Sequence, residues 1–266
     1  MAVTKTASLV FFYFGEESYV NRLAQETVPL KLALDGYDRS VLLHHDTYAG
    51  PFKVSDEDAK HATAVDIPTK ENLVKQLKDL QAGGYTTDLY VFSHGSTKNF
   101  RVSKGTYGEN ATITAAYIES KITKPIDLRM VWQCNCYGST MNPTWEKLGA
   151  KATAGSRYVN FYPTRFSAFA ERWAAGKPFA TCLKEADTAV VRTPVQAYML
   201  VDAAARLGEW DGNLIDAARV LGNNGASLRY FQKCWLGDDA KVGVAGKDRM
   251  NQSSVMVVGG DGTLTR

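Results

Sequence analysis

Two stretches of the chain decide its fold: LYVFSHG at residues 89–95 and LRMVWQCNCYG at residues 128–138. Each is an apolar run of the kind that forms a buried strand in a parallel sheet, and each ends in a reactive side chain followed closely by glycine. His94 comes at the end of the first strand, and Cys134 and Cys136 come at the end of the second. A histidine base, a thiol and exposed backbone N–H groups are the parts of a thiol nucleophile system, so the pattern predicts a cysteine hydrolase.

Strand-like runs alternate with helical patterns along most of the chain. Strands are expected at residues 8–14, 40–43, 89–92, 128–132, 150–154 and 255–258, and helices at residues 20–34, 69–80, 114–122, 145–148, 166–175, 178–191, 195–207 and 214–221. This alternation predicts an α/β fold with a mostly parallel sheet and right-handed crossovers. Ligands bind at the carboxyl ends of the strands in such sheets, and both reactive stretches are expected there.

The composition is that of a chain with one large core. Of the 266 residues, 45% are hydrophobic, and we expect a main domain at residues 1–192 with a mainly helical C-terminal extension, residues 193–266, packed on it. The formal net charge is +3 and no Lys/Arg tract is concentrated, which argues against nucleic acid as a partner. No segment approaches the roughly twenty apolar residues that span a bilayer, so a membrane is not expected either.

The four cysteines, at positions 134, 136, 182 and 234, do not form a secreted-type disulfide framework. The apolar run at residues 9–14 has neither the length nor the cleavage pattern of a signal peptide, and a reducing, cytoplasmic setting is expected. His44 and His45 with the cysteine pair lack the ligand spacing of a zinc site. The acidic residues 56–58 lack the alternating pattern of a calcium loop, so no metal or other cofactor is expected.

The reactive residues, taken in order, point to a family. A hydrophobic strand, Ser93-His94-Gly95, a helix, a second strand and Gln133-x-x-Cys136-Tyr137-Gly138 resemble the caspase-like (clan CD) cysteine peptidases, which include caspases, metacaspases, legumains and bacterial CHAT domains. The runs at residues 145–156 and 169–178 are similar to the CHAT-type continuation. The resemblance covers roughly residues 5–190. It implies a caspase-like three-layer α-β-α sandwich and a His-Cys dyad.

Two thiols compete for the role of nucleophile. Caspases read Gln-Ala-Cys-x-Gly, whereas this chain has one extra residue; counting back from the glycine selects Cys136, and Cys134 remains the alternative. His94 is expected to act as general base and then to protonate the leaving amine. The N–H groups of Gly95 and of the nucleophile are expected to stabilise the oxyanion, with glycine at 95 because a Cβ could crowd the substrate carbonyl.

The resemblance places the substrate pocket at the end of the strand that follows the cysteines. The residues expected to line it are Ser156, Arg157, Tyr158, Asn160 and Tyr162. Arg157 in the pocket would bind an acidic side chain, and Asp46 or Asp66 would bind a basic one. By analogy with bacterial relatives, we expect an endopeptidase that cleaves proteins or peptides after a basic residue through an acyl-enzyme thioester.

Two other functions fit the same residues. The first is a catalytically silent caspase-like binding or scaffold module, and the second is a hydrolase or transferase that uses the dyad on a non-peptide acyl group. The presence of His94, Gly95 and Cys136 together favours the peptidase, because a decayed site commonly loses one of these residues. The oligomeric state stays open.

Overall fold

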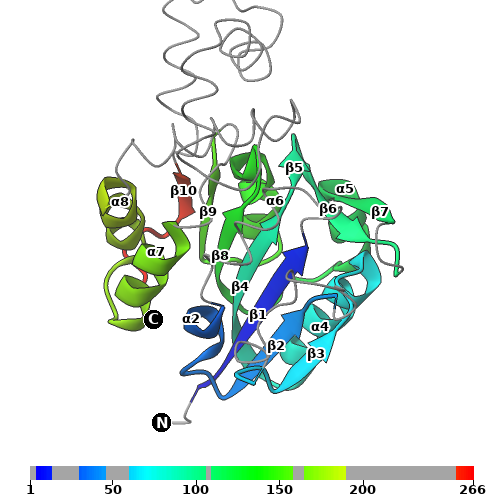
Figure 1. The fold of residues 1–266 in the computed structure, drawn as a ribbon, viewed down its shortest axis with the longest axis horizontal. Helices are drawn as coiled ribbons and strands as arrows, with labels where there is room; N and C mark the ends of the chain where they lie inside the picture. Colours follow the sequence, from blue (N-terminus) through cyan, green and yellow to red (C-terminus); the bar gives the residue numbers. More distant parts are fainter. Residues whose placement is uncertain (1–3, 14–29, 46–59, 106–108, 158–164, 190–255) are drawn as a thin grey trace, which may run out of the picture.

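In the computed structural model, a seven-stranded sheet with the order β10-β9-β8-β4-β1-β2-β3 carries helices on both faces (Figure 1). The structure describes residues 4–13, 30–45, 60–105, 109–157, 165–189 and 256–266. Within these ranges the strands of this sheet are β1 (Lys5–Tyr13), β2 (Arg39–Leu43), β3 (Ala64–Asp66), β4 (Tyr85–Ser93), β8 (Leu128–Cys134), β9 (Ala152–Ser156) and β10 (Met256–Gly260). Each pair of neighbouring strands is parallel except β9 and β10, which are antiparallel. The predicted α/β class with a mostly parallel sheet is confirmed.

The sheet separates two apolar cores. Alternate residues of the central strands, among them Tyr90 and Trp132, pack against α2 (Lys31–Leu34), α7 (Arg165–Ala174) and α8 (Phe179–Ala189). The intervening residues, among them Leu89 and Val131, pack against α4 (Lys70–Ala82), α5 (Ala115–Lys121) and α6 (Asn142–Lys147). Because strands covered on both faces are mostly apolar, β1 has the nearly continuous apolar run SLVFFY. The result is the expected three-layer α-β-α arrangement.

A second, three-stranded antiparallel sheet follows His94. It consists of β5 (Gly95–Ser96), β6 (Asn99–Ser103) and β7 (Asn110–Thr114), in the order β5-β6-β7 (Figure 1). The sequence pattern did not predict this sheet or β3, because these strands are short and none carries a long apolar run. Phe100, Val102 and Ile113 on its inner side belong to the α4 side of the core, so the small sheet covers part of that face.

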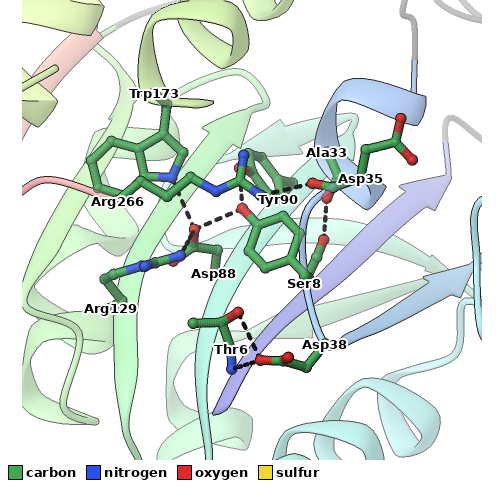
Figure 2. Close-up of polar contacts among 11 residues, drawn as sticks. Thr6, Ser8, Ala33, Asp35, Asp38, Asp88, Tyr90, Arg129, Trp173 and Arg266 are labelled. Carbon is green, nitrogen blue, oxygen red and sulfur yellow. Dashed lines mark hydrogen bonds and ion pairs between the residues drawn. The ribbon is translucent and has the colours of Figure 1, made fainter. Parts of the chain in front are cut away.

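A buried polar cluster lies on the opposite face, near the start of β4. Asp88 is 0% exposed, and Arg129 donates to its two carboxylate oxygens at 2.8 and 2.7 Å. The Tyr37 hydroxyl donates to the same carboxylate at 2.7 Å. The Trp173 indole also donates to it, at 2.9 Å, and Figure 2 shows Trp173 and Arg129 directed toward Asp88. Burial beside the Asp88 charge raises the pKa of Tyr37 well above its ordinary value, since both would penalise a phenolate. These contacts tie α7 to the middle of the sheet.

Several predicted elements lie wholly or mostly outside the described residues. These are the helices at residues 195–207 and 214–221 and most of the helix at residues 20–34. The expected last strand is present as β10, which pairs with β9 at the sheet edge. Among the described helices, none is both long and apolar enough to cross a membrane.

Candidate active site

The register of β4 and β8 brings the two reactive stretches together. In this parallel pair Phe92 is opposite Cys134, so His94 and Cys136 each follow the last paired position of adjacent strands by two residues. Adjacent strands are about 4.8 Å apart. The predicted base and the predicted nucleophile therefore lie at matching positions on the carboxyl edge of the sheet, and each is half-buried.

Gly95 shows how closely the two strand ends approach. A Cβ placed on this glycine would lie 2.6 Å from Asn135 Nδ2 and 2.9 Å from the Cys136 carbonyl oxygen. Real Cβ atoms essentially never approach backbone atoms this closely, so the segment after His94 packs directly on the backbone of the cysteine stretch. The structure thus gives glycine at 95 a reason other than the predicted one: a side chain would collide with the protein's own cysteine turn.

Cys136 lies in a tight turn after β8. The Gly138 N–H donates to the Asn135 carbonyl oxygen at 3.1 Å, and Tyr137 has the left-handed backbone conformation, with φ 55° and ψ 23°. The short 3-10 helix η1 (Gly138–Met141) starts immediately afterwards. A left-handed backbone is unfavourable for tyrosine, and such conformations persist where the surrounding structure holds them. The thiol is therefore carried by a turn of defined shape.

The side chain of Gln133, in β8, stabilises this turn through hydrogen bonds. Its side chain is 0% exposed, and its amide donates to the Gly138 carbonyl oxygen at 3.2 Å and to Asn142 Oδ1 at 3.0 Å. The Trp145 indole donates to Gln133 Oε1 at 3.0 Å. Both ends of the glutamine amide are thus satisfied in the core, and the start of η1 is held against β8.

Gly155 of β9 packs against the backbone of the same turn. A Cβ on Gly155 would lie 2.3 Å from both the Gly138 carbonyl carbon and the Ser139 nitrogen. Since Gly155 pairs with Gln133 across the sheet, the turn lies flat on the end of β9. Glycine inside a strand often marks such a close approach of another backbone.

The three described cysteines differ in surroundings. Cys134 is 4% exposed and belongs to the apolar core with Trp132, whereas Cys136 is half-buried in the turn beyond the strand. Cys182 is 0% exposed on α8, and burial raises the pKa of its thiol to about 11. A reactive thiol needs exposure and access to its thiolate form, so these environments favour Cys136 over Cys134.

The backbone of His94 is fixed by β6. The His94 carbonyl oxygen accepts hydrogen bonds from the Arg101 N–H at 2.8 Å and from the Ser93 hydroxyl at 3.0 Å. The Ser93 hydroxyl also lies 2.8 Å from the Arg101 carbonyl oxygen, and its side chain is buried. The small sheet therefore holds the histidine at the end of β4.

The predicted substrate-binding residues are placed in part. Ser156 ends β9, is 0% exposed and donates to Met256 Sδ of β10 at 3.5 Å, and Arg157, which follows it, is exposed. Because β9 pairs with β8, Arg157 lies on the side of the cysteine turn away from His94. The remaining predicted residues, Tyr158, Asn160, Tyr162 and Asp46, lie outside the described part of the chain.

Asp66 has a local structural role. It ends β3, the edge strand three places from β4, and its Oδ1 accepts hydrogen bonds from the Ile67 N–H at 2.8 Å and from Asn72 Nδ2 at 2.9 Å. These contacts stabilise the start of α4, far from the cysteine turn. His44 and His45 are both buried at the end of β2. Within the described ranges, no three His, Cys, Asp or Glu side chains form a group that could hold a metal ion.

The sequence interpretation gave no structural role to several residues that hold the two strand ends and the cysteine turn. These residues are Gln133, Asn135, Gly155 and Thr140. Asn135 is 1% exposed, and its Oδ1 has no hydrogen-bond partner among the described residues. Gly155 directly follows the strand predicted at residues 150–154, and a glycine at this place was the signal that could have indicated such a contact.

No protein-family model and no curated protein matches this chain. Its fold is similar to that of a secreted C11 cysteine protease from Bacteroides thetaiotaomicron in complex with an irreversible peptide inhibitor, with a TM-score of 0.45 and 9% identity over 87% of this chain and 82% of that chain. A structure of a secreted C11 cysteine protease, "iotapain", from the same organism has a TM-score of 0.46 and 9% identity over 77% of this chain and 72% of that one. Neither is described as a CHAT protein, so the CHAT-type likeness stays a prediction. A likeness this distant carries no argument about function.

Proposed function

We propose that the chain is a cysteine endopeptidase in which Cys136 is the nucleophile and His94 the general base and acid. The observation that carries this proposal is the register of β4 and β8, which brings both residues to matching positions at the carboxyl edge of the sheet. The contact of Gly95 with the Cys136 backbone supports it further. A structural role for each residue alone would not require this pairing at the edge where ligands bind in α/β sheets.

The proposed reaction follows from thiol chemistry. His94 takes the proton of the Cys136 thiol, and the sulfur attacks the carbonyl carbon of the scissile peptide bond. Backbone N–H groups of Gly95 and Cys136 stabilise the tetrahedral oxyanion. When the intermediate collapses, the C–N bond breaks, His94 protonates the leaving amine and a thioester remains on Cys136. Water, deprotonated by His94, then hydrolyses the thioester and regenerates the thiol.

The residue preferred before the scissile bond depends on two charged positions. The predicted preference for a basic residue now depends on Asp46, because the carboxylate of Asp66 serves the start of α4. An acidic side chain would be bound by Arg157 at the end of β9. The residue found before each cleaved bond distinguishes a basic preference from an acidic one.

The test is cleavage of a diverse peptide mixture under reducing conditions, with and without calcium, read by mass spectrometry. We expect Cys136→Ala and His94→Asn to abolish cleavage, and Cys134→Ala to retain it. Cys182→Ala is the matched control, since this thiol is buried on α8 and should not affect the reaction. Loss of cleavage in Cys134→Ala with retention in Cys136→Ala would reverse the assignment of the nucleophile. A folded native chain that cleaves nothing would contradict the peptidase and favour a silent binding module.

A further inference from the structure

Two residues other than glycine have left-handed backbone conformations among those that the structure describes. They are Lys98, with φ 58°, and Tyr137, with φ 55°. Lys98 is at the tip of the hairpin between β5 and β6, four residues after His94, and Tyr137 directly follows Cys136. Unfavourable backbone conformations of this kind cluster at functional sites and persist where neighbouring groups hold them. Each half of the proposed dyad is therefore followed by one such turn.

A single hydroxyl joins the two turns. Thr140 Oγ1 accepts a hydrogen bond from the Lys98 N–H at 2.7 Å and donates one to the Tyr137 carbonyl oxygen at 2.7 Å. A hydroxyl has one proton and two lone pairs, so it can make both bonds at once. The Thr140 N–H also donates to the Tyr137 carbonyl oxygen, at 2.9 Å. Thr140 thus contacts both left-handed residues through their main chains.

The hairpin tip has a second attachment on the far side. The Ala115 N–H, at the start of α5, donates to the Lys98 carbonyl oxygen at 3.0 Å. Lys98 is therefore held between α5 and η1, and the Thr140 hydroxyl adds a hydrogen bond between the hairpin and the cysteine turn to the direct contact at Gly95. Loss of the hydroxyl would leave the Lys98 N–H without this acceptor and would loosen the hairpin tip against the turn.

We propose that Thr140 is a positioning residue that holds His94 and Cys136 at the separation needed for proton transfer between them. This inference rests on the proposed function and adds a residue that touches neither substrate nor the reacting atoms. Its effect is on the geometry of the pair, because the hydroxyl connects the segment after the base with the segment after the nucleophile. Small misplacements of reacting groups lower rates by large factors.

The test compares Thr140→Val, which keeps the shape and removes the hydroxyl, with Thr140→Ser, which keeps the hydroxyl. Thr144→Val is the matched control, because Thr144 is a buried threonine of α6 that donates to Glu119 Oε1 at 3.1 Å, away from the two turns. The readout is the rate at which iodoacetamide alkylates Cys136, followed by mass spectrometry as a function of pH. A thiol paired with histidine forms its thiolate below the ordinary midpoint of about 8.5.

We expect Thr140→Val to slow alkylation at neutral pH by about ten- to a hundredfold and to move the pH midpoint toward about 8.5. Thr140→Ser and Thr144→Val should stay within about twofold of the native rate. On a cleaved peptide, Thr140→Val should lower kcat with little change in KM. Native rate and midpoint in Thr140→Val, or an equal loss in Thr144→Val, would overturn the inference.

The same assay separates this inference from the proposed function. If alkylation of Cys136 depends on His94 but not on Thr140, the inference fails and the dyad stands. If the native thiol titrates at the ordinary midpoint and His94→Asn changes nothing, the proposed function itself fails, and the positioning role fails with it. A cooperative urea unfolding transition for each variant shows that the variant is folded in the absence of urea, under the conditions of the alkylation assay.

Discussion

Replacing Arg129 with methionine tests how much the buried Asp88 cluster contributes to the fold. The Asp88 carboxylate is 0% exposed, and the arginine side chain that binds both of its oxygens is 11% exposed. Methionine occupies much of the arginine stem but leaves the carboxylate with two neutral donors, Tyr37 and Trp173. Removing one partner of a buried ion pair costs about 3–5 kcal/mol, because the other charge stays buried. The free energy of unfolding should fall by that amount, which is a large part of the roughly 5–15 kcal/mol of a typical domain.

The assay is urea unfolding at pH 7, followed by circular dichroism and fluorescence. With a slope of about 3 kcal/mol/M, Arg129→Met should lower the midpoint by about 1–1.7 M. Lys75→Met is the control: it removes the exposed ion pair with Asp79 on α4, at 2.8 Å, and should leave the midpoint unchanged. Trp173→Phe removes one hydrogen bond to the carboxylate, worth about 1.5–3 kcal/mol, and gives a measurable variant if Arg129→Met does not fold. Equal midpoints for Arg129→Met and Lys75→Met would refute the reasoning.

Three further predictions concern the cysteine turn, the thiols and acid stability. Gly155→Ala should slow alkylation of Cys136, because the added Cβ would lie 2.3 Å from the backbone of Gly138 and displace the turn; an unchanged rate would contradict this contact. In the native protein at pH 7.5, iodoacetamide should label Cys136 before Cys182, since burial raises the pKa of Cys182 to about 11; mass spectrometry showing the reverse order would contradict the assignment. Hydrogen bonds from Lys177 and Arg172 lower the pKa of Glu185 below its ordinary value of 4.5. The contribution of Glu185 to stability is therefore present above about pH 4.5 and is lost as the pH falls through the lowered pKa. The difference in urea midpoint between the native chain and Glu185→Gln should therefore shrink in acid, and a difference independent of pH would argue against the linkage.

The elements that could be predicted are those whose pattern is local. β1, β4 and β8 each contain an apolar run, at residues 9–13, 89–92 and 130–132, because both faces of the sheet are covered. α4 has an apolar stripe and a capping residue, Thr69, whose side chain accepts from the Asn72 N–H at 3.1 Å. β5, with its two residues Gly95 and Ser96, could not be predicted, since pairing with β6 and not residue type makes it a strand.

In the candidate site, too, features with a local sequence pattern could be predicted, whereas features that depend on contacts between distant residues could not. Strand ends, and hence the positions of His94 and Cys136, could be read from where the apolar runs stop. The contacts that support them could not, because they join residues distant in the chain. Thr140 meets Lys98 across 42 positions, and Gly155 meets Gly138 only after β9 has paired with β8. No local periodicity reports such contacts.

The strands of the main sheet shorten from its centre to its edges. β1 and β4 have nine residues each, whereas the edge strand β3 has three and the edge strand β10 has five. Unpaired backbone groups on a long edge would offer a template to a strand of another molecule, and short edge strands are one way in which proteins avoid aggregation. Within the part of the chain that the structure describes, the taper therefore leaves few backbone groups at the outermost strands for another molecule to pair with, and lengthening β3 or β10 by design would offer a longer template.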